Sequence, residues 1–76
     1  MVKAVIWKVM LRRRGHRNYH YAATKYSRRD PQRGEAITVR DFDNTPVKAV
    51  IAHIAREQSA GLKRRVFTVQ ADEVET

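Results

Sequence analysis

Arginine is the residue type in this sequence whose number and spacing could do chemistry. Sixteen lysines and arginines stand against eight acidic residues, and eleven of the sixteen are arginine. The guanidinium group binds phosphates and carboxylates in a fork and stacks on bases, whereas lysine acts mainly as a point charge. The net charge of +8 therefore favours a polyanionic partner. A GC-rich coding bias, which would enrich arginine without functional meaning, is the alternative.

Most of the cations gather in three segments. We expect them to contact nucleic acid or a partner that carries it, and the alternative is a solvated face that keeps a small protein soluble. The candidate residues are Arg12, Arg13, Arg14 and Arg17, then Arg28, Arg29 and Arg33, and last Lys63, Arg64 and Arg65.

Tyr19 and Tyr21 complete the candidate interface. They flank His20, and Lys25 follows in the same apolar segment. Alternating aromatic and basic residues are typical of single-strand binders, where stacking is worth about 1–3 kcal/mol per base. Tyrosines are also favoured on strands for cross-strand packing alone, so both interpretations stay open.

Residue patterns for catalysis or metal binding are missing from the sequence. His16, His20 and His53 do not have the spacing of a paired metal motif, and the chain has no cysteine. Neither serine lies in a Gly-x-Ser-x-Gly context, and there is no glycine-rich phosphate loop. A chain of 76 residues also leaves little room for an enclosed cleft. We therefore predict no enzymatic activity, no metal site and no cofactor.

Alternating apolar and polar residues predict three strands in the first half of the chain, over 2–11, 19–27 and 35–42. In the first strand, Val5, Trp7, Val9 and Leu11 share one face. Polar segments that contain Gly15 or Gly34 connect the strands and are typical of hairpin loops.

A helix is predicted to begin at Pro46 and to end before Gly61. Asp43, Asn44 and Thr45 offer N-capping side chains, and proline suits the first helical turn. An apolar stripe follows at helical spacing and consists of Val47, Val50, Ile51, Ile54 and Ala55. A fourth strand is expected over 62–71. The predicted fold is α/β (α+β), a two-layer sandwich ordered strand-strand-strand-helix-strand, with one domain over 1–71 and a flexible acidic tail over 72–76.

Strand directions assign the charges to two ends of this fold. The loop after the first strand lies at the upper end, where the third and last strands finish in acidic residues. The second loop and the start of the last strand lie at the lower end, where only Asp30 and Glu35 oppose the cations. We expect the lower end to carry the stronger positive field, and the Trp7 ring to be buried under the helix.

The strand-rich layout over 2–71 and the arginine-rich, cysteine-free composition resemble small phage-encoded host-takeover proteins, among them the RNA-polymerase-binding antitermination proteins of lytic Xanthomonas phages. The resemblance implies a non-catalytic regulator that binds host RNA polymerase beside its nucleic acid and inhibits initiation or causes antitermination. It also implies a location in the cytoplasm of a bacterial host. The apolar start of the chain is too short for a membrane span and contains Lys3 and Lys8, so no contact with a membrane is expected.

The segment over 26–35 is similar to arm-type DNA-binding domains of phage integrases, because an Asp-Pro-x-x-Gly turn there precedes a strand and a predicted helix. That resemblance implies an autonomous DNA- or RNA-binding domain with a sheet that enters the major groove. A third hypothesis is an inhibitor that presents arginine where phosphates sit in a host defence or replication enzyme.

Overall fold

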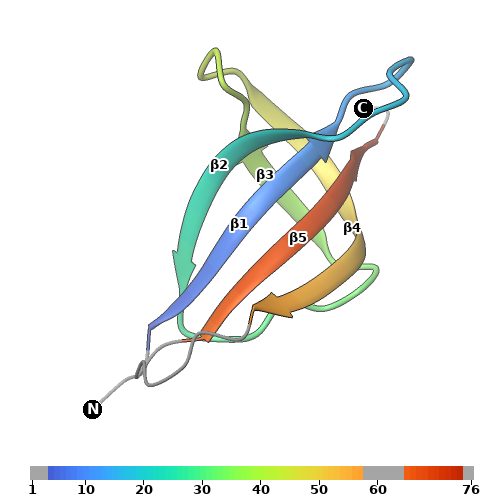
Figure 1. Ribbon diagram of the computed structural model, residues 1–76. Coiled ribbons are helices and arrows are strands. Elements are labelled where there is room, and N and C mark those ends of the chain that lie inside the picture. The colour runs from blue at the N-terminus through green and yellow to red at the C-terminus, as the bar shows by residue number, and fades with distance from the viewer. Residues whose placement is uncertain (1–3, 58–64, 75–76) are drawn as a thin grey trace.

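The computed structural model describes residues 4–57 and 65–74, and these residues form five strands and no helix. The strands are β1 (Val5–Arg12), β2 (His20–Ser27), β3 (Ala36–Arg40), β4 (Pro46–Glu57) and β5 (Arg65–Glu73). Figure 1 shows them as one curled sheet in the form of a half-barrel. The fold is all-β, so the predicted α/β sandwich is wrong.

The sheet has the strand order β2-β1-β5-β4-β3, which makes β2 and β3 its two edges. β1 pairs with β5 in parallel, and the other neighbours are antiparallel. β1 and β5 therefore begin at the same end, where β2 and β4 finish; we call this the lower end. The opposite end, where β1 and β5 finish, is the upper end.

The hydrophobic core lies on the inner face of the curl. β1 contributes the four side chains that the sequence predicted to share a face, and all four are fully buried. β5, β4 and β3 supply most of the rest, namely Phe67, Val69, Ala71, Val47, Ala49, Ile51, Ile37 and Val39. Because the sheet curls around its own apolar face, the core closes without a second layer.

The predicted helix is wrong because β4 occupies its segment. Val47, Ala49 and Ile51 alternate on the inner face of β4, and a bulge between Ile51 and His53 then returns Ile54 to that face. The bulge places Val47, Ile51 and Ile54 of the predicted helical stripe on one face of a strand, whereas Val50 and Ala55 fall on the other face. Four β-branched residues in this segment favour the strand, whose first five residues pair with β3 and whose residues from Ala49 to Glu57 pair with β5.

The residues that were predicted to cap a helix form a hairpin turn between β3 and β4. Asn44 adopts a left-handed conformation with φ of 68°, and the Asp41 and Thr45 backbones are hydrogen bonded across the turn. Asparagine tolerates this conformation better than most residues. Pro46 opens β4 opposite Arg40, and a first strand position accommodates proline.

Several sequence expectations are confirmed. The three early strands and the last strand lie where they were predicted, within a few residues. Trp7 is buried in the core with Ile51, Val39 and Phe67, although no helix covers it. Asp72 and Glu73 belong to β5, whereas the sequence placed them in a flexible tail. No helix in the described residues is long and apolar enough to cross a membrane.

Candidate nucleic-acid interface

Within the described residues, carboxylates form ion pairs with Arg12 and Arg13 at the upper end. Arg12 Nε lies 2.9 Å from Asp72 Oδ1. Arg13 lies between two acids, with Nη1 2.7 Å from Asp41 Oδ2 and Nε 3.0 Å from Glu73 Oε1. Both hydrogen bonds raise the pKa of Arg13 above its ordinary value, and the bond to Asp41 has the larger effect. Arg12 and Arg13 thus hold the strand ends together and offer little charge to a ligand.

Asp41 is the centre of this upper network. Its side chain is buried, and it accepts hydrogen bonds from Arg13, from His20 Nε2 at 2.7 Å and from the Phe42 amide at 2.8 Å. Burial raises the pKa of the carboxyl and is the largest single influence, but the three donors together hold that pKa below its ordinary value. Because His20 opens β2 and Asp41 follows β3, their contact joins the two edges of the sheet.

Arg14, Arg17 and Tyr19 lie in the loop between β1 and β2. The backbone amide of Arg14 donates to Glu73, which lowers the pKa of that carboxyl. Tyr19 donates its hydroxyl to Asp72 at 2.8 Å, and the Arg12 guanidinium lies over its ring. Burial and the Asp72 contact raise the pKa of Tyr19. Arg17 is exposed and forms no ion pair with the described residues.

The lower end carries two of the predicted arginines in ion pairs. Arg29 is paired with Glu35, and this hydrogen bond is the main reason why the pKa of Glu35 is lowered. Arg65 lies 3.4 Å from Asp30. The Arg29–Glu35 pair closes the segment over 28–35 on itself, and the Arg65–Asp30 pair binds that segment to β5. Gly34 and Glu35 also exchange backbone hydrogen bonds with Ile51 of β4.

Three further arginines at the lower end form no ion pair with a carboxylate of the described residues. Arg28 and Arg33 are exposed on the segment over 28–35, and Arg56 is exposed at the end of β4. None of the three forms an ion pair within the described part of the chain. Lys25 on β2 lies over the Trp7 ring, 5.4 Å from its centroid. We call Lys25, Arg28, Arg29, Arg33, Arg56 and Arg65 the lower basic cluster.

The indole ring of Trp7 contacts two cations of the lower basic cluster. Its Nε1 donates to the backbone carbonyl of Arg29 at 3.1 Å, and the Arg29 guanidinium lies 5.2 Å from the ring centroid. The register places Lys25, Trp7, Phe67 and Arg56 in one row across four strands. The indole thus holds two cations of the cluster beside a rigid core.

The outer face of the sheet presents two exposed tyrosines. Tyr21 and Tyr26 on β2 are 52% and 73% exposed, and they lie beside Met10 and Ile6 of β1. Tyr21 was predicted as a site residue, whereas Tyr19 is tied to Asp72 instead. The arginine clusters of the sequence are therefore split, with Arg12 to Arg17 at the upper end and Arg28, Arg29, Arg33 and Arg65 at the lower end. Lys63 and Arg64 lie outside the described residues.

Sequence reasoning missed Lys25 and Arg56 in the cluster and Phe42 at the upper end. Arg56 was assigned to the outer side of a helix, so its position opposite Phe67 could not be foreseen. Lys25 could have been found, because it follows Ala23 by two residues and therefore lies on the same face of the second predicted strand. That face pairs with Trp7 of the first strand. Phe42 is 78% exposed, and an aromatic residue inside a turn of Asp and Asn was the available signal.

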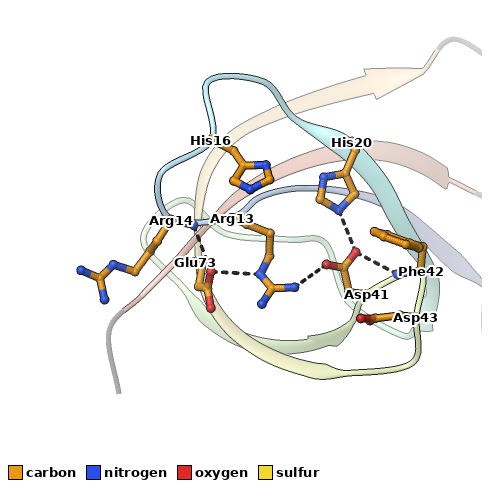
Figure 2. A pocket seen from close by; sticks show the side chains of 8 residues that line it. All are labelled: Arg13, Arg14, His16, His20, Asp41, Phe42, Asp43 and Glu73. Atoms are coloured by element: carbon orange, nitrogen blue, oxygen red, sulfur yellow. Dashed lines mark hydrogen bonds and ion pairs between the residues drawn. The ribbon is translucent and has the colours of Figure 1, made fainter.

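A recess at the upper end is shown in Figure 2. It is lined by Arg13, Arg14, His16, His20, Asp41, Phe42, Asp43 and Glu73. The Phe42 ring meets the His20 ring edge to face, with centroids 5.6 Å apart. Within the described residues, no group of three or more His, Asp or Glu side chains is arranged to hold a metal ion.

Comparison with known proteins identifies no relative that could assign a function to the upper or the lower end of the sheet. The resemblances to phage host-takeover proteins and to integrase arm domains stay predictions. No protein-family model, curated protein or solved structure matches this chain.

Proposed function

We propose that this protein binds nucleic acid without catalysing a reaction, and that the lower basic cluster contacts the phosphates. The observation that carries the proposal is the larger excess of cations over carboxylates at the lower end, where the six cations of the lower basic cluster face Asp30 and Glu35. At the upper end, Asp72, Asp41 and Glu73 pair with Arg12 and Arg13. At the lower end, Arg28, Arg33 and Arg56 have no carboxylate partner among the described residues, and Lys25 adds a fourth charge.

Arginine in this arrangement suits phosphates better than a single anion. Three exposed guanidinium groups, two on the segment over 28–35 and one on β4, present forked donors to a chain of phosphates. Each phosphate that is neutralised releases counterions, so the binding constant depends steeply on salt. The ordered core beneath Lys25 and Arg29 limits the entropy that these side chains lose on binding.

A charge-matched pair of triple variants tests the location of the interface. Arg28→Ser, Arg33→Ser and Arg56→Ser together should weaken binding of a single-stranded decamer at least tenfold at low salt. The log–log salt slope should become shallower by about 2, at about 0.7 per lost phosphate contact. Fluorescence anisotropy over a range of salt concentrations measures both quantities.

The control removes the same charge from the upper half of the molecule. Arg17→Ser, Arg40→Ser and Lys48→Ser together replace three exposed cations that also lack a described carboxylate partner. This variant should lose less than half as much affinity, and circular dichroism must show that both variants fold. Equal losses in the two variants would mean that net charge alone governs binding, and the lower basic cluster would then have no special role.

Regulation of host RNA polymerase in the bacterial cytoplasm, and inhibition of a host enzyme, stay predictions of the sequence. Both differ from the proposal in that a protein is the primary partner. A pull-down from bacterial lysate, with and without nuclease, separates them. Recovery of polymerase subunits after nuclease treatment would favour the polymerase hypothesis, whereas recovery only with intact nucleic acid supports direct binding to nucleic acid.

A further inference from the structure

The recess at the upper end has a floor whose polar groups are already satisfied. Arg13 lies between Asp41 and Glu73, and Asp41 also binds His20. Figure 2 shows these groups linked in one chain of contacts beneath the opening. Since each of them already has a partner, a ligand would gain little from displacing them. They instead fix the positions of the residues at the rim.

The rim offers an aromatic ring and a carboxylate. Phe42 is the most exposed large hydrophobic residue in the described part of the chain, and its contact with His20 holds the ring in place at the opening. Asp43 accepts the Thr45 amide at 3.1 Å through Oδ1, and it forms no ion pair with a described cation. His16 is exposed on the other side of the opening.

These rim groups select a ligand that is planar and donates hydrogen bonds. An unpaired carboxylate repels phosphate and accepts only from N–H or O–H donors. An exposed aromatic ring binds the face of a planar group by stacking. An unpaired nucleobase has both features, whereas a phosphate or a sugar lacks the stacking face.

Guanine fits the carboxylate better than the other bases. Its Watson–Crick edge presents two neighbouring donors, at N1 and N2, which match the two oxygens of one carboxylate. Adenine and cytosine place a donor beside an acceptor, and uracil places its single donor between two acceptors. We propose that the recess binds one unpaired guanine, with Phe42 stacking on the base and the Asp43 carboxylate accepting from N1 and N2.

This proposal rests on the proposed function, because the guanine belongs to a strand whose phosphates contact the lower basic cluster. β1 contains eight residues, so the two ends are separated by about 26 Å at about 3.3 Å per residue. A strand of several nucleotides is needed to reach both ends.

The test measures the preference for guanine with labelled RNA decamers. One decamer is uridine throughout, and two others carry a single central guanosine or adenosine. Wild-type protein should bind the guanosine decamer about fivefold or more tightly than the adenosine decamer, within the range of one stacked and hydrogen-bonded base. The ratio of the two dissociation constants is the quantity to compare between variants.

Two variants and one control assign the preference to the recess. Asp43→Asn keeps an oxygen for the Thr45 amide but replaces the second acceptor with a donor, so the ratio should fall to about one. Phe42→Ala should weaken binding of the guanosine decamer more than that of the uridine decamer. Tyr26→Ala removes a similarly exposed ring from the outer face and should leave the ratio unchanged.

The outcomes separate the two proposals. Equal affinity of wild-type protein for all three decamers, or a guanosine preference that survives Asp43→Asn, would overturn the guanine site and leave phosphate binding intact. A lack of binding by every decamer at low salt would overturn both proposals.

Discussion

Trp7→Ala should reduce the free energy of unfolding by about 3–5 kcal/mol, the usual cost of truncating a buried tryptophan to alanine. A domain of 76 residues has a total stability of about 4–11 kcal/mol, at about 0.05–0.15 kcal/mol per residue. The change therefore removes a large share of the stability. Since a small domain loses about 4–8 °C per kcal/mol, the thermal midpoint should fall by at least about 12 °C.

The effect is large because Trp7 supports three parts of the molecule. Its ring is fully buried between β2 and β5, and its Nε1 holds the carbonyl of Arg29 in the segment over 28–35. Lys25 and Arg29 rest over the ring. Truncation would leave a cavity and an unpaired carbonyl, and it would release two cations of the lower basic cluster.

Trp7→Phe is the matched control for this prediction. It keeps an aromatic ring beneath Lys25 and Arg29 but loses the N–H donor, so we expect a smaller loss of about 1–3 kcal/mol. Thermal unfolding followed by circular dichroism measures all three proteins, because the only tryptophan is absent from both variants. A Trp7→Ala protein that unfolds cooperatively near the wild-type midpoint would contradict the central position of this ring.

The position of Trp7 could be predicted from the sequence, because strict alternation over Val5, Trp7, Val9 and Leu11 is a local signal. That the segment over 46–57 forms a strand and not a helix could not be predicted. Its Val47, Ile51 and Ile54 fit a helical stripe, and they also share one face of a strand once one residue is placed in a bulge. Pairing with β3 and β5 decides between the two, and β5 begins eight residues after β4 ends. Such non-local contacts leave no mark on local spacing.

The candidate site, like the fold, could be predicted from the sequence only in part. Strand directions alone placed Asp41, Asp72 and Glu73 beside the upper arginines, and the ion pairs of Arg12 and Arg13 confirm that expectation. The contact between His20 and Asp41 was not foreseen, because it depends on the curl that brings β2 and β3 together. Phe42 was predicted to end the third strand and Asp43 to cap a helix, so their place at the rim of a recess could not be derived.

Asp41→Asn should reduce the free energy of unfolding at pH 7 by about 1–3 kcal/mol, the usual cost of leaving buried partners unsatisfied. An amide can accept from only one of Arg13 and His20, and its NH₂ group then faces the other donor. The two edges of the sheet lose a charged contact between them. Asp43→Asn, in the same turn but exposed, should change stability by less than about 0.5 kcal/mol.

The same variant should reveal how this contact depends on pH. The pKa of Asp41 is lower in the folded protein than in the unfolded chain, so the folded state is stabilised by the ionised carboxylate. That stabilisation is complete well above the unfolded pKa of about 3.9, and it is lost as the pH falls through the folded value.

Wild type and Asp41→Asn should therefore differ in stability at pH 7 and converge below about pH 4. Glu35, whose pKa is lowered by its contact with Arg29, remains in both proteins, so its contribution cancels in the difference. Glu73 shares Arg13 with Asp41, so a change in its pairing belongs to the measured effect. Urea unfolding at several pH values measures this difference, and a constant gap between pH 7 and pH 3 would show that the Asp41 carboxylate does not hold the two sheet edges through its charge.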